Sequence, residues 1–155
     1  SGALGLAAEF LEEHPHVGAR EVDVFGNAPS HLHGISHETH RGRPLFSPFP
    51  TIRHLDRHPP LRLTLDLAHW HLVCERTFGD DRRFLQADVV PHVDHIHARI
   101  GSPQHPQTPH GWDHDRDALA DHEWLWRAVW DRKAARGVDE ILVTPELGPP
   151  PYQVG

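Results

Sequence analysis

Four short strand-like runs, separated by helix-like segments, constrain the fold of this chain more than any other feature. The runs cover residues 35–39, 61–67, 93–100 and 140–145. A strand, a loop and a helix repeated at steps of about 30 residues form the βα unit of a parallel sheet or barrel. The sequence therefore predicts an α/β fold in which these four runs are parallel neighbours.

Each run carries a side chain of metal-ligand type near its C-terminal end: Glu38, Asp66, His97 and Glu146. Strands of a barrel present their C-terminal ends at one face, so four such side chains converge on one point. Carboxylates and one imidazole make a hard, mixed site that suits Mn²⁺, Mg²⁺, Co²⁺ or Zn²⁺. Of the two histidines in the third run, His95 and His97, only one is expected to face the other ligands.

A simpler interpretation of the acidic residues is an ordinary ion pair. Glu38 and Asp66 would then pair with Arg41 or Arg62, since charges near strand ends are commonly compensated by a neighbour. Convergence of all four candidates at one point would favour the metal site over this alternative.

Composition narrows the partners and the location. The chain has 155 residues, with 22 acidic against 15 basic residues and a net charge of −7, which argues against nucleic acid as a partner. No run approaches the roughly 18 apolar residues of a membrane span. No segment resembles a secretory signal, and the single cysteine, Cys74, cannot form an internal disulfide. These features predict a cytoplasmic protein.

The chain divides into two parts. Residues 1–34 are predicted to hold an N-terminal helix over 3–13 and a strand-like linking segment, with the alternating run 20–25. Residues 35–155 carry the four runs and the metal site. Helices in this second part are predicted over residues 51–57, 80–90 and 113–136.

The ordered motifs resemble those of the sugar-phosphate isomerase/epimerase superfamily, the xylose-isomerase-like TIM barrels. Members of that superfamily hold a divalent metal with Glu, Asp, His and Glu from the last four strands of the barrel. The likeness covers residues 35–152 and implies a partial (βα) barrel equivalent to the last four βα units. The matching motifs are HETHRG with Glu38, LDLAH with Asp66 and His69, HIHAR with His97, and TPELG with Glu146.

The resemblance also implies a chemistry. The substrate would be a small sugar or sugar-like α-hydroxy-carbonyl compound, converted through an enediolate while Glu38 and Glu146 transfer the protons. His69 matches a substrate-binding histidine of the superfamily. Arg41 and Arg99 are candidates to pair with a carboxylate or phosphate of the substrate.

The chain departs from the superfamily at two positions and in its length. Ketohexose epimerases carry Glu six residues after the first ligand and Arg six after the histidine, where this chain has Pro44 and Pro103. A complete barrel takes about 200–250 residues. Two other functions therefore stay open: a truncated half-barrel that keeps the ligands in a structural role, or a lyase or hydrolase on the same scaffold.

A half-barrel with helices on one side has two open edges and is expected to expose an apolar interior. A homodimer, or another chain that completes the barrel, is the predicted partner beside the small-molecule substrate. Alternatively, residues 17–34 fold over one edge, and the run 20–25 adds a strand there.

Overall fold

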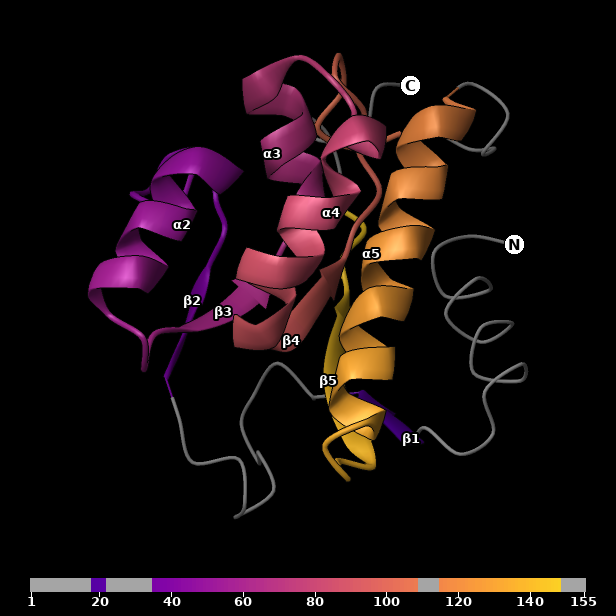
Figure 1. Ribbon diagram of the computed structural model, residues 1–155. Helices are drawn as coiled ribbons and strands as arrows, with labels where there is room; N and C mark the ends of the chain where they lie inside the picture. Colours follow the sequence, from indigo (N-terminus) through magenta and orange to yellow (C-terminus); the bar gives the residue numbers. More distant parts are fainter. Residues whose placement is uncertain (1–17, 22–34, 109–114, 149–155) are drawn as a thin grey trace.

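The computed structural model describes residues 18–21, 35–108 and 115–148 (Figure 1). Its strands are all parallel and form one sheet in the order β1-β5-β4-β3-β2. The predicted α/β fold with four neighbouring parallel strands is confirmed. Those four strands are β2 (Ser36–Glu38), β3 (Arg62–Leu65), β4 (Val93–Ala98) and β5 (Glu140–Pro145).

The first strand, β1 (Gly18–Glu21), lies outside the four predicted runs and pairs in parallel with β5. It overlaps the predicted run 20–25 at two residues, so a strand from this region does lie at the β5 edge, with bounds other than those predicted. Residues 22–25 and the predicted helix over 3–13 lie outside the described residues. Strand β2 is the outermost strand at the other edge.

Helical segments connect the strands, and their positions follow local signals. Helix α2 starts at Pro48, earlier than predicted, because proline suits the first helical turn. Helix α5 starts after Asp115, whose carboxylate accepts a hydrogen bond from the backbone N–H of Ala118 at 3.0 Å. The predicted segment 80–90 consists of short helical turns of several types. The segments are α2 (Pro48–Arg57), α3 (Leu67–Cys74), η1 (Gly79–Asp81), α4 (Arg82–Phe84), η2 (Leu85–Val89), η3 (Val90–His92) and α5 (Arg116–Ala134).

Helix α3 was not predicted, and it corrects the expected end of the strand over 61–67. The strand ends at Leu65, and Asp66 caps the new helix by accepting a hydrogen bond from the N–H of Ala68 at 3.0 Å. The helix sequence LAHWHLVC is apolar or buried on nearly every side, so it lacks the polar stripe that marks an amphipathic helix.

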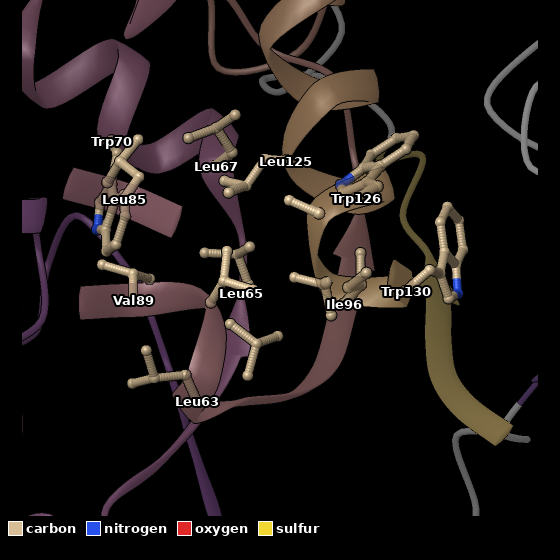
Figure 2. Packing of buried hydrophobic residues seen from close by; sticks show 14 of the residues in the cluster. Leu63, Leu65, Leu67, Trp70, Leu85, Val89, Ile96, Leu125, Trp126 and Trp130 are labelled. Atoms are coloured by element: carbon tan, nitrogen blue, oxygen red, sulfur yellow. The ribbon is translucent and has the colours of Figure 1, made fainter. Parts of the chain in front are cut away.

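One face of the sheet packs against the helices and forms the core (Figure 2). Leu63, Leu65 and Ile96 of the strands are fully buried against Trp70 and Leu125 of the helices. Truncating a buried leucine of this kind to alanine typically costs about 2–5 kcal/mol. Among the described helices, none combines the length and apolar character needed to cross a membrane.

The opposite face of the sheet carries a row of polar side chains on four strands, where an apolar interior was expected. Hydrogen-bonded side chains from four strands cross this face in one row. The polar row consists of Ser36, Thr64, His95 and Thr144.

Candidate metal centre

The four candidate ligands all lie where a strand ends. Glu38 is the last residue of β2, and Asp66 follows β3 directly. His97 is the second-last residue of β4, and Glu146 follows β5 directly. The ends of β2 and β3 are fixed to each other by Thr39: its Oγ1 donates to the carbonyl of Asp66 at 2.9 Å and accepts from the Asp66 N–H at 2.8 Å.

The structure brings three of the candidates together as a possible metal-binding group. Glu38, Asp66 and His97 each offer one ligand atom, and these atoms lie within 4.8 Å of one another. Glu146 joins them through the histidine: Nδ1 of His97 lies 3.0 Å from Oε1 of Glu146 and 3.2 Å from Oε1 of Glu38. These four residues form the candidate metal centre, which is called the metal centre below for short.

The imidazole of His97 shows that these residues fit a cation. Its Nδ1 is buried and close to two carboxylates, yet neither carboxylate is aligned with it as a hydrogen-bond partner. Burial works to lower the pKa of His97, but Glu146 and Glu38 outweigh burial and raise it to about 9. The site therefore favours positive charge at this nitrogen, and a metal ion would supply such charge.

The carboxylates of the metal centre differ in their electrostatic surroundings. The nearby imidazole of His97 is the main cause that lowers the pKa of Glu38 to about 2, and Arg43 also donates to this carboxylate at 2.7 Å. Burial raises the pKa of Asp66 to about 6, although Arg99 works in the opposite direction. The pKa of Glu146 is lowered, chiefly by the imidazole of His97 beside it.

Arg99 turns into the metal centre and lies buried there. Its Nη2 is 2.5 Å from Oδ2 of Asp66 and donates to Nε2 of His69 at 2.6 Å, while Nη1 is 3.4 Å from Oε2 of Glu146. Burial, followed by the charge of Arg99, lowers the pKa of His69 to about 3, so this histidine is neutral. Arg99 thus balances part of the negative charge of the centre.

The polar row lies directly beneath the metal centre, because each ligand comes two residues after one of its members. Nε2 of His95 lies 2.8 Å from Oγ1 of Thr144, and Nδ1 lies 3.4 Å from Oγ1 of Thr64. The rings of His95 and His97 are 5.0 Å apart. Both histidines therefore share one face, which corrects the expectation that only one of them does. Side chains two residues apart on a strand point the same way.

Both acidic residues of the simple ion-pair interpretation do contact an arginine, but these are Arg43 and Arg99. Arg62 donates to Asp94 at 2.7 Å, and Glu38 has Arg43 as its partner. Arg41 lies exposed on the loop after β2.

Sequence analysis did not single out Arg43 or the hydroxyl groups of the polar row. The spacing of two residues before each ligand is the signal that could have found the row.

Comparison of the chain with protein-family models, with curated proteins and with solved structures gave no match in any of the three searches. The resemblance to the sugar-phosphate isomerase/epimerase superfamily consequently rests on the motifs of the metal centre and on the parallel α/β sheet.

Proposed function

We propose that the chain binds one divalent metal ion at the metal centre and uses it to isomerise or epimerise a small sugar-like substrate. The supporting observation is the convergence of Glu38, Asp66 and His97 from three consecutive strand ends. Glu146 is the proposed fourth ligand, because it lies against the same nitrogen of His97 as Glu38. Oxygen and imidazole donors of this kind suit Mn²⁺, Mg²⁺, Co²⁺ or Zn²⁺.

A bound divalent ion would polarise the carbonyl and hydroxyl oxygens of an α-hydroxy-carbonyl substrate. The lowered pKa values of Glu38 and Glu146 keep both carboxylates ionised near neutral pH, so either can accept a proton from carbon. For an isomerisation, one carboxylate would take a proton from carbon, exchange it in part with solvent and return a proton to the neighbouring carbon, while the hydroxyl proton passes to the former carbonyl oxygen. An epimerisation would need the second carboxylate to return a proton on the opposite face of the same carbon. Glu146 is the better candidate to take the proton from carbon, since its side chain is 29% exposed against 16% for Glu38.

Substrate oxygens would be held by residues at the rim of the centre. His69 is neutral and lies beside Arg99, so it is suited to a hydrogen bond with a hydroxyl group. Arg99 and the exposed Arg41 are the proposed partners of a carboxylate or phosphate on the substrate.

Calorimetric titration of the metal-free protein with Mn²⁺ tests the metal site. We expect one ion per chain, loss of binding in His97→Ala, and at least about 10-fold weaker binding in Glu146→Ala. The matched control is His37→Ala, because His37 is an exposed histidine on the same strand as Glu38. Unchanged affinity in both the His97 and the Glu146 variants would contradict the site.

The reaction is tested separately by incubating the Mn²⁺-loaded protein with a panel of aldoses and ketoses in D₂O. Proton transfer at carbon places solvent deuterium next to the carbonyl group, which ¹H NMR detects. Deuterium incorporation that is lost in Glu146→Gln would support the proposed reaction.

A second candidate function is a structural half-barrel without catalysis. It is favoured by Arg99, whose contacts with Asp66 and Glu146 already balance part of the charge of the centre within the chain. Metal binding without any deuterium incorporation across the panel would support this alternative.

A further inference from the structure

A second group of buried polar side chains lies behind the metal centre, between α3 and α5. His71 of α3 is fully buried, and Asp121 of α5 is 2% exposed. Nε2 of His71 lies 3.3 Å from Oδ2 of Asp121, and Nδ1 lies 3.3 Å from the backbone carbonyl oxygen of Gly101. Neither His71 nor Asp121 has a role in the proposed reaction, so the pair needs an explanation of its own.

Both ring nitrogens of His71 face groups that only accept hydrogen bonds. A carboxylate and a carbonyl offer lone pairs alone, so each nitrogen is satisfied only when it carries a proton. A ring that donates from both nitrogens would satisfy both contacts, one to Oδ2 of Asp121 and one to the carbonyl of Gly101. The same carboxylate also accepts a hydrogen bond from the backbone N–H of Phe78 and lies 3.5 Å from Nη2 of Arg82.

An ion pair at this depth needs a reason other than stability. Replacing such a pair by apolar side chains of the same volume is often neutral or stabilising, so its net contribution is small. What the pair does provide is direction, because charged hydrogen bonds fix the orientation of the groups they join. The arrangement therefore favours a role in which His71 and Asp121 hold neighbouring groups in position.

The backbone carbonyl of Gly101, which His71 contacts, belongs to the same segment as Arg99 of the metal centre. Gly101 lies two residues after Arg99, and a Cβ atom added at Gly101 would come within 2.7 Å of the Cβ of Ala68 and 2.8 Å of the Pro106 carbonyl oxygen. The segment after β4 is therefore pressed against the first turn of α3. Asp66 caps that same turn and contacts Arg99 from it.

We propose that the buried pair of His71 and Asp121 is a positioning device that holds Arg99 against Asp66 at the metal centre. Asp121 orients the ring of His71, the ring holds the carbonyl of Gly101, and the segment so fixed carries the guanidinium of Arg99. The consequence for metal binding rests on the proposed function, whereas the position of Arg99 is a property of the protein alone.

The first test uses the metal-free, unmodified protein. Histidine ¹⁵N NMR at neutral pH reports whether each ring nitrogen carries a proton, and His71→Gln identifies the signals of this residue by their loss. We expect both nitrogens of His71 to be protonated. A ring with one protonated nitrogen would overturn the proposal.

The second test compares Asp121→Asn with Val129→Ala. The asparagine keeps the size and an acceptor oxygen but removes the charge, whereas Val129 is a fully buried residue of the same helix that serves as a control for lost packing. We expect Asp121→Asn to shift the side-chain N–H signals of Arg99 and to weaken Mn²⁺ binding by about 3- to 10-fold. The control should destabilise the protein without either effect.

Unmoved Arg99 signals in Asp121→Asn, or equal shifts in the control, would overturn the proposal. If Asp121→Asn does not fold, His71→Gln is measured against the same control with the same criteria. If the unmodified protein binds no Mn²⁺, the proposed function fails while the NMR signals of Arg99 still decide the positioning role.

Discussion

Asp66 and Arg99 form a buried ion pair at the junction of β3 and α3, with Nη2 of Arg99 2.5 Å from Oδ2 of Asp66. The other carboxylate oxygen, Oδ1, accepts a hydrogen bond from the N–H of Ala68 at 3.0 Å. One carboxylate therefore caps a helix, partners a buried guanidinium and belongs to the candidate metal group. Substitutions of Asp66 can separate these roles.

Asp66→Asn and Asp66→Ala are expected to differ in stability but not in metal binding. Asparagine is a good helix cap and alanine is a poor one, so the alanine variant should be less stable by about 1 kcal/mol. Both remove the charged ligand, so Mn²⁺ affinity should fall at least about 10-fold in each. Urea denaturation and calorimetry measure the two quantities. Equal stabilities would contradict the capping role, and an unchanged affinity would remove Asp66 from the ligands.

The stability of the metal-free protein should fall as the pH rises from 6.5 to about 9. The pKa of His97 is raised from 6.5 to about 9 on folding. Protonated His97 therefore contributes fully to the free energy of unfolding below pH 6.5, and this contribution is lost as the pH rises through about 9. The loss should be on the order of 2–3 kcal/mol. The pKa of Asp66, raised from 3.8 to about 6, affects stability only below this range.

Urea denaturation across that pH range measures this loss, and His97→Gln is the control because glutamine at this position does not titrate. The free energy of unfolding of the variant should not fall between pH 6.5 and 9, since the histidines His69, His95 and His122 have lowered pKa values. A slope as steep as that of the unmodified protein would assign the pH dependence to a different group.

His69→Asn should keep the bound metal and lose turnover. The Nε2 of His69 accepts a hydrogen bond from Arg99 at 2.6 Å, so this lone pair is already used, and the low pKa keeps the ring neutral. Metal content by atomic absorption should match that of the unmodified protein, while deuterium incorporation into the substrate should fall by at least about 10-fold. Metal loss as large as in His97→Ala would place His69 among the ligands instead.

The alternation of side chains explains why the strands and the ends that carry the ligands could be predicted from the sequence. The run over Glu140–Pro145 has the predicted bounds, because it lies between the end of a long helix and a proline-rich segment. Helix α3 could not be found in the same way, since its residues are buried on both sides and show no polar stripe. Its existence depends on packing between β3, β4 and α5 that no local pattern contains.

The metal centre was predictable only in part for a related reason. Glu38, Asp66 and His97 follow from strand ends, and a strand period of two would also have placed His95 beside His97. The inward turn of Arg99 depends on carboxylates just after two other strands, those of buried Asp66 and half-buried Glu146. That arrangement is decided by three-dimensional contacts and is absent from the sequence pattern.

The chain is predicted to form a homodimer through the edge of the sheet at β2. Strand β1 pairs with β5 at one edge, whereas β2 is the outermost strand at the other edge, and Ile35 beside it is 81% exposed. The polar row shows that the interior face does not itself require an apolar partner. Among the described residues no strand lies beyond β2, and an edge that begins with an exposed isoleucine favours pairing with a second copy.

Light scattering should therefore give a mass near twice the 17.6 kDa of one chain. The unfolding midpoint should rise with protein concentration, since dissociation accompanies unfolding of a dimer. Ile35→Lys should yield the monomer, because a charged residue at an edge opposes strand pairing. Val138→Lys, at a residue that is 40% exposed in the connection between α5 and β5, should remain dimeric as the control.

A compact monomer at every concentration would rule out the dimer. The metal centre would then belong to a half-barrel in which β1 covers one edge and β2 stays open.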